Sequence, residues 1–307
     1  MKVVANGLEF EVEDSASINP LDADLQARPV VVLIMGLGMQ LIAWPQQFVD
    51  DLVDAGYRVI RFDNRDIGLS SHLDHLGRPR IVWEVLKHRL GLRNRSAYSL
   101  ADMAADTLGI LDTLGIKRAH IVGVSMGGMI AQRVAIAAPH RVTSLTSIMS
   151  SSGARKLPQP DKAIVKLLTR RPAGAGMEAI AAQSVKLFQA IGSPAYPTPE
   201  EELMERVQAG LARSFHPVGM LRQMVAVVAD HDRAEALARI QSPTLVIHGD
   251  SDPLVPPEHG VDTANRIPGA RLVTIEGMGH DLPPEPVNQI LNALVPHLQQ
   301  AQRKVHA

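Results

Sequence analysis

Apolar runs alternate with amphipathic segments along most of the chain. Six runs predict strands, at residues 30–35, 57–62, 119–124, 142–150, 244–248 and 271–275. The run at residues 30–35 is continuously β-branched and aliphatic, which is typical of a strand buried on both faces of a parallel sheet. Helical periodicity follows several of the runs, at residues 45–55, 99–114, 126–137 and 286–299. This alternation predicts a right-handed, mostly parallel sheet with helices on both faces.

Two local signals mark where elements turn or begin. The pair Asn6-Gly7 interrupts a strand-like segment at residues 3–12. Such a pair tolerates the positive φ of a tight turn, so the segment predicts a hairpin of two short strands. Ser99 with Asp102 gives a capping-box pattern at the start of the clearest helix. With the hairpin included, we expect an eight-stranded sheet.

The strand–helix alternation is interrupted once over a long stretch. Residues 161–238 show only helical periodicity, with several prolines between the helical segments. We therefore expect an α/β core made of residues 1–152 and 239–307, with a helical cap at residues 153–238 inserted after the sixth strand. A smaller insertion at residues 72–97 contains an apolar and basic segment that could fold against this cap.

Composition narrows the class of protein. The 307 residues, nearly half of them hydrophobic, suit one α/β core with an inserted cap. The net charge is −1 and no run of Lys and Arg reaches five residues, so nucleic acid is a poor partner. The absence of cysteine excludes disulfides, thiolate metal sites and a cysteine nucleophile.

The chain shows no targeting pattern. Its first residues lack the basic and apolar regions of a signal peptide. No apolar run approaches the roughly 20 residues that span a bilayer. We expect a cytoplasmic protein without stable membrane insertion. The oligomeric state is not readable from the sequence.

The segment Gly123-Val124-Ser125-Met126-Gly127 matches G-x-S-x-G between a predicted strand and a predicted helix. Glycines two positions before and after the serine leave room where strand and helix cross. Ser125 is therefore expected in a strained conformation at a helix N-terminus, where N–H groups favour negative charge. We predict that Ser125 is a nucleophile. Nucleotide binding is not expected, because neither a complete G-x-G-x-x-G motif nor a Walker lysine is present.

A serine hydroxyl is a weak nucleophile until a base takes its proton. Among the twelve histidines, His280 lies in a glycine-flanked loop just after the last predicted strand, at the same sheet edge as Ser125. We therefore predict that His280 is the base. His120 and His248 lie in strand patterns and are interpreted as structural. His231 and His259 have no matching partner in the sequence pattern.

The acid must come from the same edge of the sheet. Asp250 and Asp252 both follow the predicted strand at residues 244–248. We favour Asp252, because the loop extends further toward His280 there, and we expect Asp250 to cap the turn. His248 and these two aspartates could also form a metal site of hard ligands. Aspartate-rich turns are usually only turns, so no metal is expected.

Acyl transfer places negative charge on a carbonyl oxygen, which preorganised N–H groups can stabilise. The backbone N–H of Met126 follows the nucleophile. The N–H of Leu37 lies in the loop Met35-Gly36-Leu37-Gly38 after the strand at residues 30–35. These two N–H groups are the predicted oxyanion hole. The two glycines of this loop also serve simply to end the strand.

At this point the chain resembles the α/β-hydrolase superfamily. The resemblance covers nearly the whole chain except the cap, and the order Ser125, Asp252, His280 is the one found in that fold. It rests on residues 123–128, 63–70, 248–253 and 277–280. Residues 33–36, the later Trp44-Pro45 and the Asn-Arg-Asp loop at residues 64–66 are similar to aclacinomycin-methylesterase-like carboxylesterases. Many members carry His-Gly where this chain has Met35-Gly36, which bears on the hydrogen bonding of that loop.

The resemblance implies a serine carboxylesterase that acts on short to medium acyl or methyl esters and needs no cofactor. A lactonase, a carbon–carbon bond hydrolase and a cofactor-free perhydrolase would use the same residues, and the sequence does not separate these activities. A binding protein with a hydrolase fold is a further alternative. The segment at residues 81–92 could lie on a lipid surface, although such a segment is more often a packed lid helix.

Overall fold

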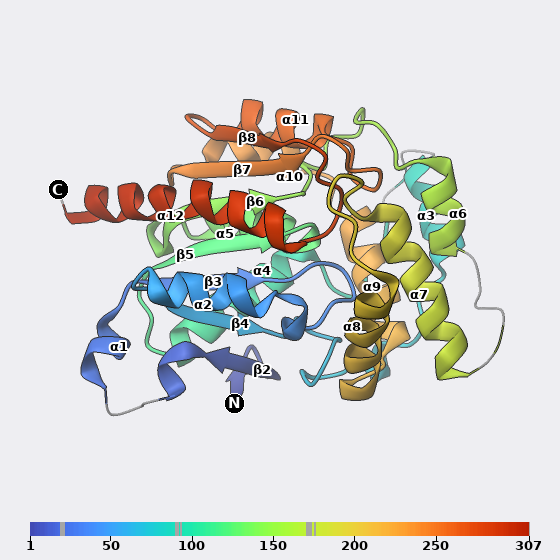
Figure 1. Cartoon of the computed structure of the whole chain (residues 1–307), viewed down its shortest axis with the longest axis horizontal. Coiled ribbons are helices and arrows are strands. Elements are labelled where there is room, and N and C mark those ends of the chain that lie inside the picture. Colours follow the sequence, from blue (N-terminus) through green and yellow to red (C-terminus); the bar gives the residue numbers. More distant parts are fainter. Residues whose placement is uncertain (19–21, 90–91, 93, 170–173, 175, 307) are drawn as a thin grey trace.

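A mostly parallel sheet of eight strands forms the centre of the molecule (Figure 1). The computed structural model describes residues 1–306 except 19–21, 90–91, 93, 170–173 and 175. The strand order is β1-β2-β4-β3-β5-β6-β7-β8. Strand β2 runs antiparallel to β1 and β4, and the other neighbours are parallel. The strands are β1 Lys2–Ala5, β2 Leu8–Asp14, β3 Val30–Ile34, β4 Arg58–Phe62, β5 Ala119–Val124, β6 Val142–Ile148, β7 Thr244–Gly249 and β8 Arg271–Ile275. The predicted sheet is confirmed.

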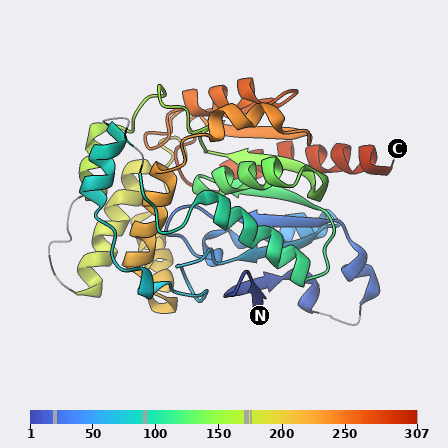
Figure 2. The same cartoon turned by 180° about the vertical axis from the view of Figure 1, so that it is seen from behind.

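Helices cover both faces of this sheet. Helices α4 and α5 lie on one face, and α2 and α12 lie on the other (Figures 1 and 2). Every residue of β3 is buried between these layers, as its continuous apolar run predicts. The helices of the core are α1 Ala23–Ala27, α2 Gln46–Asp54, α4 Leu100–Thr113, α5 Met126–Ala137, α11 Glu258–Arg266 and α12 Pro284–His306. Helix α10 Arg233–Ala236, near the end of residues 153–238, packs against α11.

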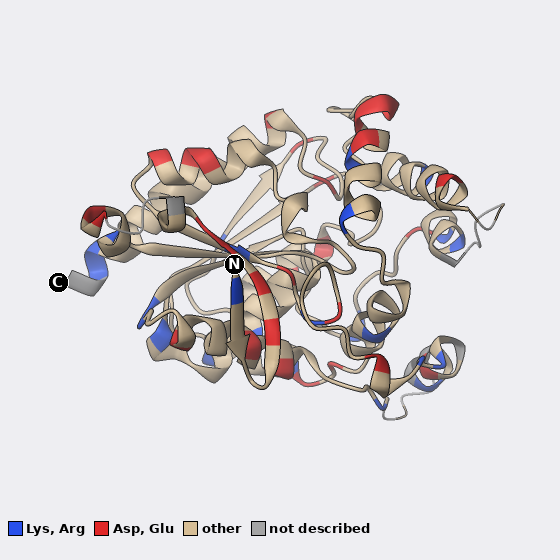
Figure 3. Ribbon diagram, turned by 90° about the horizontal axis from the view of Figure 1, so that it is seen from below, with Lys and Arg blue, Asp and Glu red and all other residues tan. Residues whose placement is uncertain are grey.

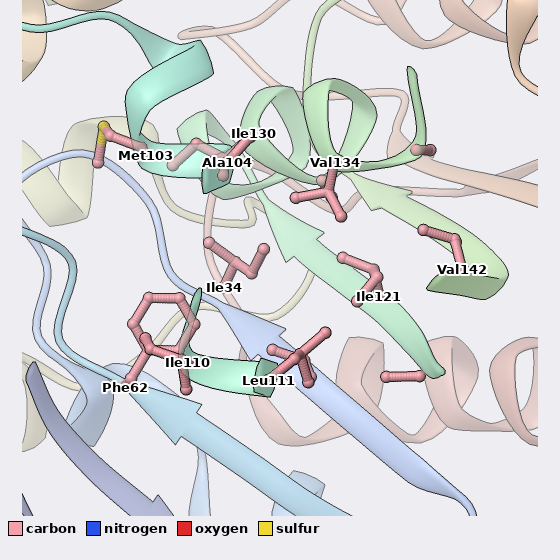
Figure 4. Close-up of a cluster of buried hydrophobic side chains, with 14 of the residues drawn as sticks. Ile34, Phe62, Met103, Ala104, Ile110, Leu111, Ile121, Ile130, Val134 and Val142 are labelled. Carbon is pink, nitrogen blue, oxygen red and sulfur yellow. The ribbon is translucent and has the colours of Figure 1, made fainter. Parts of the chain in front are cut away.

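The larger apolar cluster lies between the sheet and helices α4 and α5. Ile34 and Ile121 from the strands point toward Ile130 and Val134 of α5, and Leu111 of α4 packs beside them (Figure 4). All these side chains are fully buried. A second cluster of buried apolar residues lies between α2, α12 and the opposite face of the sheet. Because both faces are covered, the sheet is a rigid base for loops that leave its carboxyl edge.

The segment at residues 153–238, which we call the cap segment, lies beyond the carboxyl ends of the strands, at the right of Figure 1. Helices α7 and α8 share a small apolar cluster of their own, Ala181, Val185, Leu203 and Val207. Helix α3, from the insertion between β4 and α4, packs against α9. The helices here are α3 Ile81–Arg89, α6 Lys162–Thr169, α7 Met177–Ile191, α8 Glu200–Arg213 and α9 Pro217–Val228.

Basic and acidic residues are both spread over the molecule. Lys and Arg alternate with Asp and Glu along the ribbon rather than segregating by sign (Figure 3). Within the described residues, none of the helices combines the length and the apolar character needed to cross a bilayer.

Most predicted elements are present, with three differences. The hairpin forms as predicted, and Asn6 and Gly7 adopt φ values of 51° and 74°. Helix α12 runs past its predicted end at residue 299, because Ala301 continues its buried stripe and Pro296 is accommodated inside the helix. Helices α1 and α11 were not predicted. The mostly polar sequence of α11 buries only Gly260 and Thr263, so no stripe of large apolar residues marks this helix in the sequence.

Candidate active site

Ser125 occupies a sharp turn between β5 and α5. Its φ of 55° is in the left-handed region, which a non-glycine residue rarely adopts. The two flanking glycines are required by space. A Cβ at Gly123 would lie 2.1 Å from the carbonyl oxygen of Gly127, and a Cβ at Gly127 would lie 2.0 Å from that of Ile34. The sequence therefore folds into a turn that holds the Ser125 hydroxyl at the start of α5.

Three loops at the carboxyl edge of the sheet bring Ser125, Asp252 and His280 together. The Nε2 atom of His280 lies 3.0 Å from Oγ of Ser125, and its Nδ1 atom lies 2.6 Å from Oδ2 of Asp252. A carboxylate oxygen can only accept, so Nδ1 carries the proton and Nε2 accepts from the serine hydroxyl. Such an arrangement can remove the proton from the hydroxyl and steady the resulting imidazolium.

The Asp252 carboxylate is fully buried, and the His280 side chain is 8% exposed. Oδ1 of Asp252 accepts the N–H groups of Leu254 and Val255 at 2.9 and 2.8 Å. Burial alone raises the pKa of this carboxyl, but the charge and hydrogen bond of His280 and the Val255 N–H lower it below its usual value. Asp252 is therefore ionised where His280 needs a negative partner.

The other acidic and imidazole groups near this edge are engaged elsewhere. Oδ1 of Asp250 accepts the Gly277 N–H at 2.7 Å, which ties the loop after β7 to the loop after β8. His248 donates to the carbonyl oxygen of Val255 at 2.7 Å, and burial lowers its pKa, so the ring is neutral near pH 7. Within the described residues, no group of three or more His, Asp and Glu side chains is arranged to hold a metal ion.

The loop that contains Leu37 runs beside Ser125. A Cβ built on Gly36 would lie 3.2 Å from Cβ of Ser125. Met126 is the first residue of α5, directly after the serine. Met126 and the loop that contains Leu37 therefore both lie next to Ser125.

The family described as the alpha/beta hydrolase fold matches residues 29–286. The chain belongs to this family. The predicted fold class is thereby confirmed.

Two relatives show what this α/β-hydrolase is similar to. It is 32% identical over 287 residues to the rhodomycin D methylesterase DnrP of Streptomyces peucetius, covering 86% of this chain and 87% of that protein. It is 30% identical over 274 residues to a 2-hydroxy-6-oxononadienedioate/2-hydroxy-6-oxononatrienedioate hydrolase of Pseudomonas sp, covering 88% of this chain and 87% of that protein. The first relative confirms the resemblance to methylesterases.

Among solved structures, the enol-lactonase of Burkholderia xenovorans LB400 superposes with a TM-score of 0.71 at 22% identity. The match covers 97% of this chain and 100% of that chain. At this identity the likeness concerns the fold.

Asp63 and Asn64, after β4, hold the loop that contains Met35 by hydrogen bonds to its backbone. Asn64 donates from Nδ2 to the carbonyl oxygen of Met35 at 3.0 Å, and Asp63 accepts the Leu41 N–H at 2.7 Å. Both side chains are buried. The loop after β3 is therefore held by its neighbour after β4, and the Met35 side chain packs into the apolar core.

Sequence reasoning missed the contacts that support His280. The backbone N–H of His280 donates to the carbonyl oxygen of Ile191 at 2.7 Å. Ser193 accepts the Gly279 N–H at 2.9 Å and donates its hydroxyl to Asp281. These partners come from the end of α7, far away in sequence, and no local pattern marks them.

His259 and His231 contact groups on segments that are distant in sequence. Nδ1 of His259 lies 2.7 Å from Oγ of Ser151, and its Nε2 lies 2.9 Å from the carbonyl oxygen of Pro158. Nε2 of His231 lies 3.2 Å from Oδ1 of Asn94. No local pattern in the sequence marks these contacts.

Proposed function

We propose that this α/β-hydrolase is a serine carboxylesterase that hydrolyses short to medium acyl or methyl esters through an acyl-enzyme intermediate. The observation that carries the proposal is the contact chain from Asp252 through His280 to Ser125, at 2.6 and 3.0 Å. The direction of its hydrogen bonds is defined, because the buried carboxylate accepts the proton of Nδ1 and leaves Nε2 to accept from the serine hydroxyl. No cofactor takes part in this chemistry.

The proposed reaction has two halves. Oγ of Ser125 attacks the ester carbonyl carbon while Nε2 of His280 takes its proton, and Asp252 stabilises the imidazolium. The imidazolium then protonates the leaving alcohol oxygen, and the acyl group stays on Ser125. In the second half His280 removes a proton from water, the hydroxide attacks the acyl carbon, and the proton returns to Oγ as the acid leaves.

Each half passes through a tetrahedral oxyanion. The N–H groups of Leu37 and Met126 would bind this oxygen, and loss of one such donor typically costs about 3 kcal/mol of transition-state stabilisation. The Met126 N–H also lies at the N-terminus of α5, where the helix dipole favours negative charge. These groups are fixed before the reaction, so no reorganisation is needed when the charge appears.

The cap segment at residues 153–238 would cover this site, with residues 1–152 and 239–307 as the core. Met220 of α9 reaches the loop of Leu37, since a Cβ at Gly38 would lie 2.9 Å from its Cγ. Methionine is flexible and adapts to varied apolar shapes. Together with the methylesterase relative, this contact supports an apolar ester as the substrate.

Replacement of Ser125 by alanine tests the assignment. Ser125→Ala should abolish turnover of p-nitrophenyl esters and labelling by a fluorophosphonate, while the protein stays folded. Ser144→Ala is the matched control, because Ser144 also contacts a histidine, with its Oγ 2.8 Å from Nδ1 of His120, away from the sheet's carboxyl edge. Retained turnover in Ser125→Ala would overturn the proposal. Absence of labelling in the wild type would favour a binding protein.

A carbon–carbon bond hydrolase or a lactonase is the second candidate. The relative from Pseudomonas sp is named as a hydrolase of two 2-hydroxy-6-oxo dicarboxylates, and its 30% identity to this chain is close to the 32% of the methylesterase. A panel of methyl esters, p-nitrophenyl esters, lactones, vinylogous diketones and peroxide with acetate, assayed side by side, separates esterase, lactonase, carbon–carbon hydrolase and perhydrolase by relative kcat/KM.

A further inference from the structure

Gln223 connects the cap segment to the loop that carries Leu37. It lies on α9 and its side chain is fully buried. Its Oε1 accepts the backbone N–H of Gly38 at 2.9 Å, and its Nε2 donates to the carbonyl oxygen of Arg65 at 2.9 Å. A backbone N–H can only donate and a carbonyl oxygen can only accept, so the two partners fix the orientation of the amide.

The bond to Gly38 holds a peptide next to the proposed oxyanion donor. The Leu37–Gly38 peptide carries the N–H that Gln223 accepts. On the other side, the Met35 carbonyl is held by Asn64 at 3.0 Å, and the Gly36 carbonyl accepts the Met39 N–H at 3.2 Å. Three successive peptides around the Leu37 N–H are therefore fixed in direction. Gln223 supplies the constraint that comes from outside the core.

The second bond of Gln223 makes this constraint rigid. Arg65 directly follows Asn64, whose side chain holds Met35. Gln223 thus joins the two loops that surround the Leu37 N–H, with one hydrogen bond to each. The neighbouring Arg222 binds Asp66 with two bonds at 2.7 Å and donates to the Gly77 carbonyl oxygen at 2.8 Å. Arg222 thus also docks α9 on the core, whereas the hydrogen bond to the Gly38 N–H comes from Gln223.

We propose that Gln223 is a positioning residue for the oxyanion hole. It acts through the Gly38 peptide, which it keeps in the orientation that aims the Leu37 N–H at the carbonyl oxygen of the substrate. The inference rests on the proposed esterase function. The cap segment then contributes to the chemical step, in addition to covering the substrate.

The first test replaces the amide by an unbranched apolar side chain. Gln223→Met should lower kcat for p-nitrophenyl butyrate by about 10- to 100-fold, because a displaced oxyanion donor weakens transition-state binding. KM should change less than about threefold, because the ground-state carbonyl depends little on this donor. The control Gln132→Met removes another fully buried amide, which donates to Ser147, accepts from Arg233 and does not contact the loop of Leu37, and should keep wild-type kcat.

The second test uses protonation as a switch. In Gln223→Glu, a neutral carboxylic acid can accept from Gly38 through its carbonyl and donate to Arg65 through its hydroxyl. The carboxylate cannot donate and faces the carbonyl oxygen of Arg65. The ratio of kcat for Gln223→Glu to wild-type kcat should therefore rise as the pH falls, whereas the same ratio for Gln223→Met stays constant. Both kcat ratios are measured at a temperature below the melting temperature of each variant.

Three outcomes decide the inference. A fall in kcat for Gln223→Met together with a pH-dependent rescue in Gln223→Glu supports it. Wild-type kcat in Gln223→Met overturns it. It is also overturned if both Gln223→Met and Gln132→Met lose kcat, each in proportion to the fall in its melting temperature. If Ser125→Ala remains active, the proposed function fails instead, so the two failures are distinguishable.

Discussion

Asp252 presents its two carboxylate oxygens to different partners, and only Oδ2 faces His280. Oδ1 accepts two backbone N–H groups, at 2.9 and 2.8 Å, and Oδ2 lies 2.6 Å from Nδ1 of His280. The backbone donors therefore decide which oxygen is left for the imidazole. This asymmetry determines what happens when the carboxylate becomes an amide.

In Asp252→Asn, the amide oxygen must take the position of Oδ1, because the N–H groups of Leu254 and Val255 need an acceptor. The amide NH₂ then faces Nδ1 of His280 and makes that nitrogen an acceptor. The proton moves to Nε2, which can no longer take a proton from Ser125. We expect kcat to fall roughly 10³- to 10⁴-fold with the fold intact, measured with p-nitrophenyl acetate.

Asp250→Asn serves as the control for this change. Asp250 accepts from Gly277 and Ser251 and does not contact His280. Its activity should stay within about threefold of the wild type, as expected for a residue without a transition-state contact. Equal losses in the two variants would contradict the role of Asp252.

The turn at Ser125 makes a prediction about stability. A Cβ at Gly123 would lie 2.1 Å from the Gly127 carbonyl oxygen, and both glycines are buried in β5 and α5. Gly123→Ala should lower the free energy of unfolding by about 3 kcal/mol or more, because neither backbone segment can move aside. Gly176→Ala is the control, since its Cβ would meet open space at a φ of −90°. Similar melting temperatures for Gly123→Ala and Gly176→Ala would show that the backbone at this turn can accommodate a Cβ.

The sequence predicts much of this fold because the decisive signals are local. A continuous apolar run identifies β3, and the glycines around Ser125 require a strand before them and a helix after them. The positions of His280 and Asp252 follow from the rule that parallel strands end at one edge of the sheet. Each of these inferences uses residues within a few positions of one another.

The supporting contacts could not be predicted in the same way. Gln223 is 185 positions from Gly38, and Ser193 is 88 positions from Asp281. Glutamine and serine on a helix or in a loop are usually solvated, so nothing in the sequence distinguishes these two from their neighbours. The identity of such partners depends on how the cap segment is placed on the core, which local periodicity does not determine.

The pair formed by Asp66 and Arg222 predicts a pH dependence of stability. Both side chains are buried and share two hydrogen bonds at 2.7 Å. Burial alone raises the pKa of Asp66, but the bonds from Arg222 and the Leu73 N–H lower it below its usual value. The stabilisation is therefore complete above the unfolded-state pKa of about 3.9 and is lost as the pH falls through the lower folded-state pKa.

Asp66→Asn should consequently reduce the free energy of unfolding by about 3–5 kcal/mol at neutral pH, because it leaves Arg222 buried without its partner. The difference from the wild type should narrow as the pH falls below the unfolded-state pKa of about 3.9 and through the lower folded-state pKa of the wild-type carboxyl. Urea unfolding of the wild type and of Asp66→Asn at several pH values measures the loss at neutral pH and its change with pH. Asp112→Asn, at an exposed ion pair with Arg141, should change stability by less than about 1 kcal/mol throughout. A constant difference for Asp66→Asn would refute the linkage.

Ser193 predicts that the cap segment also supports His280. Its hydroxyl accepts the N–H of Gly279 at 2.9 Å and donates to Asp281, so it binds the residues on both sides of the histidine. Ser193→Ala leaves a buried N–H without a partner and should lower the free energy of unfolding by about 1–3 kcal/mol. Removing the bond should also raise the pKa of Asp281 further, since burial already raises it and Ser193 opposes that shift.

The kinetic effect of Ser193→Ala should be a fall in kcat of roughly tenfold, because a loosened loop lets the His280 imidazole leave its reactive position. Ser184→Ala is the matched control. Ser184 lies on α7, which ends two residues before Ser193, and its hydroxyl donates to the Ile180 carbonyl oxygen at 2.9 Å. This variant should keep wild-type kcat and stability. If Ser193→Ala loses stability but keeps kcat, the contact holds the cap segment to the core without positioning His280.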